Sequence, residues 1–300
     1  MYSDILVPLD GSPLSARALA YAIPVAEQHN ARLHLLHVAA PSTQPFVHIA
    51  RPTRDPSVDE AWLAEDRKAV ERIAKRARKQ TAVSIELEFR SGRAAAEIAA
   101  YARENRIGLI VMCTHGKGGF ERLWLGSVTD AVLRDLPAPL LLVRGARGVS
   151  APEPGAALFP RVLVALDGSP NAERALDAVA ALVGQTPVSL TLLSVLNPVM
   201  AMGAKSFPSP AERDLCAEYL EPLAQRHRTP ARSVEVETAV TANVGRGIVA
   251  HAAKHDASLI ALATQGLSGV QRAVVGSVAD KLIRTAPMPV LVVPSGAASN

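Results

Sequence analysis

A seven-residue stretch that occurs twice gives the first indication of the fold. Residues 7–13 read Val-Pro-Leu-Asp-Gly-Ser-Pro, and residues 164–170 read Val-Ala-Leu-Asp-Gly-Ser-Pro. The aliphatic run is typical of a buried strand, and Ser-Pro is a strong helix start, with Ser12 as the N-cap and Pro13 in the first turn. The stretch therefore predicts, in each of two copies, a strand followed directly by a helix.

The repeat continues along the rest of the chain. Residues 33–38 return as residues 190–195 with the same offset of 157, and residues 126–139 return as residues 276–289 with an offset of 150. The second copy is thus seven residues shorter between these blocks, which fits a shorter loop after its second strand. The segment between the copies is rich in Gly, Ala and Pro, as linkers are. We predict domains at 1–146 and 159–300, joined by a linker at 147–158.

Within each copy, short aliphatic runs alternate with helical patterns. Strands of this kind predict a parallel sheet covered by helices on both faces, which is an open, doubly wound α/β fold with Rossmann-like or flavodoxin-like layering. The predicted strands are 5–9, 33–38, 83–89, 109–113 and 140–143 in the first copy, and 162–166, 188–195, 234–240, 259–263 and 290–293 in the second. The predicted helices of the first copy are 13–28, 58–79, 93–104 and 127–136.

Composition narrows the classes of function. With 49% apolar and 20% charged residues, with no apolar run long enough for a membrane helix and with no signal-peptide pattern, we expect a cytoplasmic protein without a membrane partner. Its two cysteines, Cys113 and Cys216, lack the spacing of metal ligands, so we expect no structural metal. The net charge is +4, but the basic residues at 67–79 alternate at helical spacing with Glu65, Asp66 and Glu71, and the run lacks aromatic residues. We therefore expect a solvated helix face there and no nucleic-acid partner.

The candidate site follows from the fold class. In an open doubly wound sheet, ligands bind outside the carboxyl ends of the strands. Asp10 follows the first strand, where its carboxylate can accept hydrogen bonds from a base or a ribose, and Val38 ends the second strand, where its backbone can meet an adenine edge. The loop at 114–119 follows the fourth strand and leads to a helix that opens with Gly-Ser-Val at 126–128. Glycine backbone and a helix N-terminus suit a phosphate, so these features together predict a nucleotide site.

The loop spacing resembles that of the universal stress protein family. Nine residues separate Gly116 from Gly126, and nine separate Gly266 from Gly276, each time with a serine following the second glycine. The family pattern is Gly, two residues, Gly, nine residues, Gly-Ser or Gly-Thr. The resemblance covers nearly all of both copies. It implies a five-stranded parallel sheet in each, a role in the stress response, and ATP as the ligand, with or without Mg²⁺.

By position, the candidate nucleotide-binding residues fall on both copies. In the first copy they are Pro8, Asp10, Val38, Met112, Cys113, Gly116, Gly119, Gly126, Ser127 and Val128. In the second copy they are Asp167, Val195, Leu262, Ala263, Gly266, Gly276, Ser277 and Val278. Cys113 and Ala263 stand where the family has its first glycine, which departs from the pattern. The second copy also has Leu267 where the first has Lys117, so we expect it to offer less positive charge to a phosphate.

The resemblance also bears on assembly. In the family, the last strands of two domains pair antiparallel, which implies that the two copies pair within the chain through residues 140–143 and 290–293. These strands are expected to be sheet edges, and unpaired apolar edges are usually covered in native proteins. Association of two chains into a homodimer is left open.

Other interpretations of the motifs stay open. Ser127 with Asp130, and Ser277 with Asp280, match a helix-capping pattern that needs no ligand. The sequence contains no GxxxxGK[ST] motif, no GxGxxG after the first strand and no SGGxDS-like loop, which argues against a P-loop NTPase, a dehydrogenase and an ATP pyrophosphatase. We expect no catalytic residues and a regulatory nucleotide-binding module. A ligand-free scaffold and a weak ATPase or autophosphorylating protein are the alternatives.

Overall fold

The chain forms two compact units, Tyr2–Ala151 and Pro152–Asn300, called here the first and second domains. The computed structural model describes residues 2–39, 56–114, 125–144, 157–198, 210–265 and 275–295, with backbone alone at 56–63 and 210–212. The predicted linker lies outside the described residues except at positions 157 and 158.

The first domain is built on five parallel strands. Their spatial order is β3-β2-β1-β4-β5, and every neighbouring pair is parallel. The strands are β1 (Asp4–Pro8), β2 (Arg32–Ala39), β3 (Ile85–Ser91), β4 (Leu109–Cys113) and β5 (Leu140–Val143). All residues of β4 and β5 are buried, as expected for short aliphatic strands of a covered parallel sheet. The predicted fold class is confirmed for this domain.

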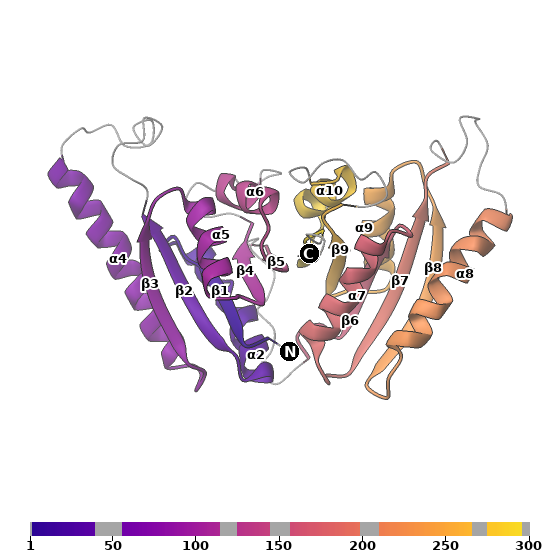
Figure 1. The fold of residues 1–300 in the computed structure, drawn as a ribbon, viewed down its shortest axis with the longest axis horizontal. Coiled ribbons are helices and arrows are strands. Elements are labelled where there is room, and N and C mark those ends of the chain that lie inside the picture. Colours follow the sequence, from indigo (N-terminus) through magenta and orange to yellow (C-terminus); the bar gives the residue numbers. More distant parts are fainter. Residues whose placement is uncertain are drawn as a thin grey trace. The chain divides into compact units, whose positions relative to one another are not determined.

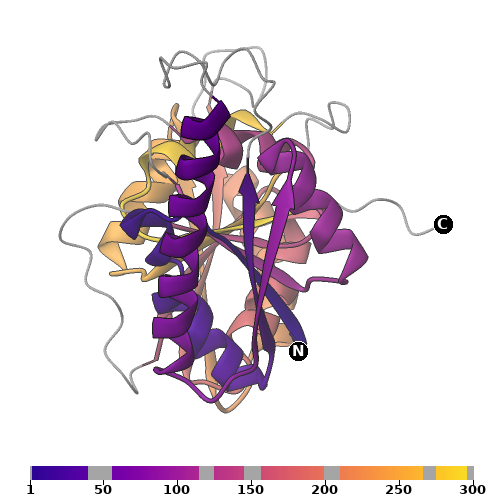
Figure 2. The same cartoon turned by 90° about the vertical axis from the view of Figure 1, so that its left-hand side faces the viewer.

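Helices cover both faces of this sheet. They are α1 (Pro13–Ala16), α2 (Leu19–His29), α4 (Pro56–Arg78), α5 (Ala94–Glu104) and α6 (Ser127–Arg134). Figure 2 shows α4 and α5 on opposite sides of the strands, which is the doubly wound arrangement. Both helices pack against β2 and β3, and α2 packs against β1, β2 and β4.

Two predicted elements of the first domain differ from the structure for local reasons, and the other predicted bounds shift by at most two residues. The helix expected at 13–28 is divided into α1 and α2. The N–H groups of Arg17 and Ala18 donate to carbonyls three residues back, as in a 3₁₀ turn, where an α-helix would use carbonyls four residues back. The backbone angles of Arg17, φ −62° and ψ −24°, are those of such a turn. The third strand begins at Ile85, later than expected, because the Thr81 hydroxyl accepts a hydrogen bond from the N–H of Val83 and holds that segment in a turn.

The second domain repeats the plan. Its parallel sheet has the order β10-β9-β6-β7-β8, and its pairs again run parallel. The strands are β6 (Arg161–Leu166), β7 (Val188–Leu196), β8 (Arg232–Val240), β9 (Leu259–Ala263) and β10 (Val290–Val293). The helices are α7 (Pro170–Val183), α8 (Pro210–His227), α9 (Val244–Lys254) and α10 (Ser277–Thr285), and each domain can be followed by its labels in Figure 1.

Candidate functional site

The Asp-Gly-Ser-Pro stretch forms the same turn in both domains. The Oδ1 atom of Asp10 accepts a hydrogen bond from the backbone N–H of Ser12 at 2.9 Å, and Oδ1 of Asp167 accepts from the N–H of Ser169 at 3.1 Å. The serine hydroxyl then caps the following helix, as predicted. The intervening glycine has a positive φ of 80° in the first domain and 86° in the second, which favours glycine at that position. Each carboxylate is therefore fixed at the carboxyl end of its first strand.

A cavity of about 540 Å³ opens at this end of the second domain. Its walls come from the ends of β6, β7 and β9 and from the starts of α9 and α10. It is lined by every candidate of the second copy that the structure describes: Asp167, Val195, Leu262, Ala263, Gly276, Ser277 and Val278. Gly266, the remaining candidate, lies outside the described residues. Seven positions spread over more than a hundred residues thus meet at one cavity.

The cavity also has walls that the motif analysis missed. Asn197 follows β7, residues 242–245 lead from β8 into α9, and Lys281 lies on α10. Asn197 and residues 242–245 could have been predicted from the fold class, because all loops at the carboxyl ends of parallel strands lie on the same side of the sheet. Nothing in the spacing indicated Lys281, because the orientation of α10 about its own axis decides which of its side chains face the cavity.

The helix after the fourth strand begins at a glycine in both domains. Gly126 and Gly276 are the N-caps of α6 and α10, and neither helix has a side-chain cap. The capping interpretation is therefore wrong, because Ser127 and Ser277 are the first residues inside their helices. The N–H of Gly276 donates to the carbonyl of Thr264 at 2.8 Å, and a Cβ at Gly276 would lie 3.2 Å from that oxygen. The close approach explains the glycine and leaves the helix N-terminus facing the cavity.

The first domain holds its candidates at equivalent positions. Pro8 is the last residue of β1, Val38 is next to last in β2, and Met112 and Cys113 end β4, while Ser127 and Val128 open α6. Since β1 lies between β2 and β4, these strand ends are neighbours at one edge of the sheet. Gly116 and Gly119 lie outside the described residues, as do His115 and Lys117.

Cys113 packs as a small buried residue. Its side chain is 7% exposed, and Sγ donates a hydrogen bond to the carbonyl of Leu14 at 2.8 Å. Burial raises the pKa of the Cys113 thiol to about 12, which keeps it protonated at neutral pH. The residue therefore joins β4 to α1 and offers no nucleophile.

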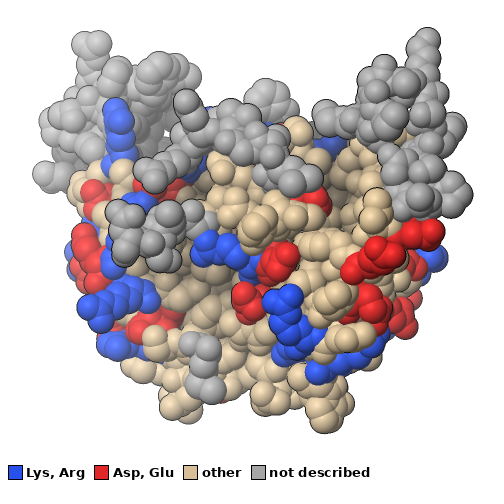
Figure 3. Space-filling view, turned by 45° about the vertical axis from the view of Figure 1, so that its right-hand side comes forward, with Lys and Arg blue, Asp and Glu red and all other residues tan. Residues whose placement is uncertain are grey.

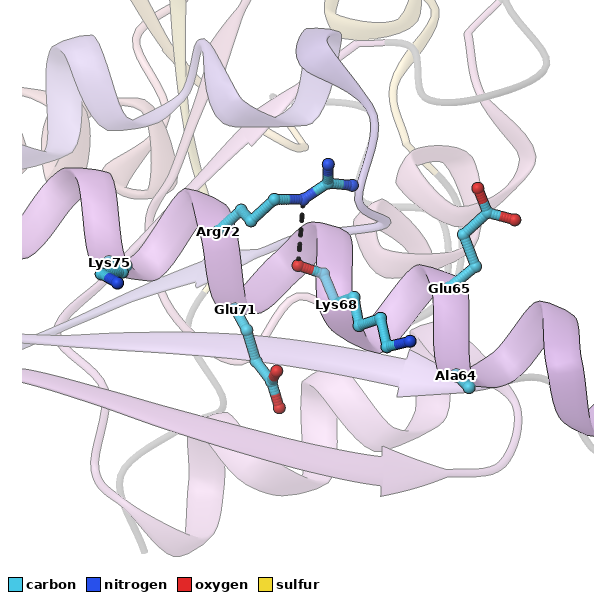
Figure 4. A pocket seen from close by; sticks show the side chains of 6 residues that line it. All are labelled: Ala64, Glu65, Lys68, Glu71, Arg72 and Lys75. Atoms are coloured by element: carbon cyan, nitrogen blue, oxygen red, sulfur yellow. Dashed lines mark hydrogen bonds between the residues drawn. The ribbon is translucent and has the colours of Figure 1, made fainter.

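A second hollow, of about 810 Å³, runs along the exposed side of α4. It is lined by Ala64, Glu65, Lys68, Glu71, Arg72 and Lys75, all on that helix (Figure 4). The Nε atom of Arg72 donates to the carbonyl of Lys68 at 3.3 Å, and Arg67 forms an ion pair with Glu71 at 3.2 Å. Acidic and basic side chains are also interspersed on the face drawn in Figure 3. The hollow is a mixed-charge helix face that lacks the converging strand ends of the first cavity.

Within the described ranges, no cluster of three or more His, Cys, Asp or Glu side chains is arranged to hold a metal ion. None of the helices in those ranges combines the length and the apolar content that a bilayer span requires.

Comparison with known proteins identifies the family. The model of the universal stress protein family matches residues 1–144 and again residues 159–294. The chain belongs to the universal stress protein family. It carries the family's domain twice in tandem, so the resemblance inferred from the loop spacing is confirmed.

Two relatives of this universal stress protein match about half of it, and one solved structure matches nearly all of it. A universal stress protein of Methanocaldococcus jannaschii is 33% identical over 144 residues, which are 48% of this chain and 83% of that protein. One from Bacillus subtilis is 32% identical over 151 residues, covering 48% of this chain and all of that protein. The crystal structure of a universal stress protein from Archaeoglobus fulgidus covers 98% of both chains with a TM-score of 0.72. At 22% identity, that likeness shows the shared fold.

Proposed function

We propose that this universal stress protein binds an adenine nucleotide, ATP, in a regulatory and non-catalytic role. The observation that carries the proposal is the cavity of the second domain, where the described candidates of that copy converge. Its volume of about 540 Å³ falls within the usual range of ligand pockets, roughly 300–1,000 Å³.

Each wall of the cavity suits a different part of a nucleotide. Asp167 offers a carboxylate acceptor for ribose or base, and Val195 and Leu262 offer apolar surface at the ends of β7 and β9. The uncapped N-terminus of α10 offers backbone N–H groups and the positive end of a helix dipole to the phosphates. The first domain supports the same assignment, since its turn at Asp10 and its N-cap glycine repeat these features.

The non-catalytic role rests on the chemistry of the same walls. Among the described residues that line the cavity there is no histidine or cysteine, and Asp167 is the one carboxylate. Its Oδ1 already accepts hydrogen bonds from the backbone and the hydroxyl of Ser169, the latter at 2.7 Å. A carboxylate held in this way is better suited to recognition than to activating water.

Calorimetric titration of the full chain with ATP tests the proposal. Replacing Asp10 or Asp167 by Asn keeps the turn acceptor and removes the charge, and we expect each substitution to weaken binding at its own domain by about 1–3 kcal/mol. Asp177→Asn, an exposed change on α7, is the matched control and should leave binding unchanged. Absence of heat with ATP at high protein concentration would favour the scaffold, and steady release of phosphate would favour the ATPase.

A further inference from the structure

The second-domain cavity is lined by a basic side chain, Lys281, that lies outside the sequence motif. Among the described residues that line it, Asp167 and Lys281 are the ones with charged side chains. Lys281 lies on α10, one turn beyond Ser277, and is half-buried. The equivalent position of the first domain is Ala131 on α6. The lysine is therefore a feature of the second site alone.

The stem of Lys281 lies across a glycine of the neighbouring helix. A Cβ added to Gly245 would lie 3.0 Å from Cδ of Lys281 and 3.2 Å from its Cγ. Gly245 is buried near the start of α9, which packs against α10. In the first domain Ala95 occupies the position of Gly245, opposite Ala131. Glycine destabilises a helix relative to alanine, so here it has a steric role: it leaves a groove for the lysine stem.

Because its stem lies beside Gly245 near the start of α9, we infer that the ammonium group of Lys281 lies toward the N-terminus of α10. Helical side chains lean toward the N-terminal end of their own helix, which for Lys281 is the turn that starts at Gly276. That end already carries the positive pole of the helix dipole, where a cation is unfavourable without an anion beside it. Asp280, the adjacent carboxylate on α10, is engaged by Arg284 at 2.9 Å. A bound anion would satisfy both positive features.

We propose that Lys281 contacts the phosphate groups of the nucleotide in the second domain and sets the preference of this site for phosphorylated over neutral adenine compounds. The inference rests on the proposed function. It assigns to α9 and α10 together a role in phosphate recognition, with Gly245 positioning the lysine that makes the contact.

Titration of the full chain with ATP and with adenosine tests the role of Lys281. The background carries Gly126→Asp, to repel phosphate, and Asp10→Asn, to weaken ribose or base contacts, so that we expect the heat from both compounds to report mainly the second domain. We expect Lys281→Met to reduce ATP affinity on the order of ten-fold while adenosine affinity stays unchanged, because only ATP loses a charge-assisted hydrogen bond. Lys281→Arg should retain most of the ATP affinity. Lys254→Met removes the same charge at the other end of α9, where Lys254 pairs with Glu237, and should change neither affinity.

A double-variant cycle tests the positioning by Gly245. Gly245→Ala should lower ATP affinity in the chain that retains Lys281, because the added methyl displaces the lysine stem. The same substitution in a Lys281→Ala chain should have no effect on ATP. A purely structural glycine would lower the affinity in both.

The outcomes separate this inference from the proposed function. If the chain binds ATP at the second domain and Lys281→Met binds it equally well, the inference is wrong and the proposed function stands. If Lys281→Met loses adenosine together with ATP, the lysine supports the fold of the pocket and the inference is again wrong. If the unmodified full chain binds neither compound, both fail.

Discussion

At the scale of single residues, the least expected feature is a buried polar network in the first domain. His34 is 3% exposed, with Nε2 placed 2.9 Å from Asp4 Oδ1 and Nδ1 placed 2.9 Å from the hydroxyl of Tyr101. Arg32 adds an ion pair to Asp4 at 3.1 Å. Such a network stabilises the domain only while each member keeps its hydrogen-bond partner. Because Asp4 must stay ionised to keep its ion pair, the stability of this domain depends on pH.

The pH dependence follows from Asp4. Burial by itself raises the pKa of Asp4, but hydrogen bonds from His34 and Ser3 and the charge of Arg32 outweigh burial and hold that pKa below its usual value. A carboxyl with a lowered folded-state pKa adds stability above its unfolded pKa of about 4 and loses it as the pH falls through the folded value. We expect the stability difference between the unmodified chain and Asp4→Asn to shrink below about pH 4. Thermal melts at a series of pH values measure it, and a constant difference would contradict the assignment.

At the scale of elements, the turn between the first strand and the first helix of each domain has a matched pair of glycines. Both have positive φ, so alanine should be strained at either by roughly 1–2 kcal/mol. Their surroundings differ, since a Cβ at Gly11 would lie 3.3 Å from Cβ of Ala69 and 3.4 Å from the Asp66 carbonyl, whereas one at Gly168 meets nothing within 4 Å. We therefore expect Gly11→Ala to destabilise its domain more than Gly168→Ala does. Urea unfolding of each variant gives the two values; equal values would mean that α4 yields at this contact, and the reverse order would contradict the steric argument.

The start of α10 supports a second element-scale prediction. At Gly276, alanine adds only the Cβ that approaches the Thr264 carbonyl at 3.2 Å, whereas aspartate adds a carboxylate at the proposed phosphate position. We expect Gly276→Asp to weaken ATP binding at the second domain by at least about 1.5 kcal/mol more than Gly276→Ala does, because a repelling charge replaces an attractive helix terminus. Calorimetry in the Gly126→Asp background compares them. Equal affinities of the two variants would exclude phosphate from the helix start.

At the scale of the whole molecule, the pairing of the two copies through their last strands stays a prediction. Within its own domain, β5 pairs with β4 and β10 pairs with β9, so each is the last strand of its sheet. Proline at Leu142 or Val292 removes a ladder donor and weakens each strand. If the strands pair with each other, the double variant should lose less stability than the two single variants combined, because either proline already disrupts the shared interface. Thermal unfolding of all four chains measures this coupling, and additive losses would argue against the pairing.

The features that could be predicted from the sequence rest on local or repeated information. The runs at 109–113, 140–143, 259–263 and 290–293 became strands with the predicted boundaries, since a short aliphatic segment between turn signals has few other options in a covered sheet. The offset between the copies located the second Asp-Gly-Ser turn and the second Gly-Ser helix start, and the resemblance to the family followed from that spacing. These features depend on neighbours in the chain, which a sequence records directly.

The tertiary structure alone decided which distant residues share the pocket. Asn197, Asn243 and Lys281 reach one cavity because parallel strands bring the ends of widely separated segments to the same side of a sheet. From the loop residues alone, the second site is expected to offer less positive charge to a phosphate. Lys281 adds a basic side chain to this cavity from α10, one turn beyond the Gly-Ser motif. Its stem lies beside Gly245 of the neighbouring helix, and spacing along the chain carries no record of which faces of two helices meet.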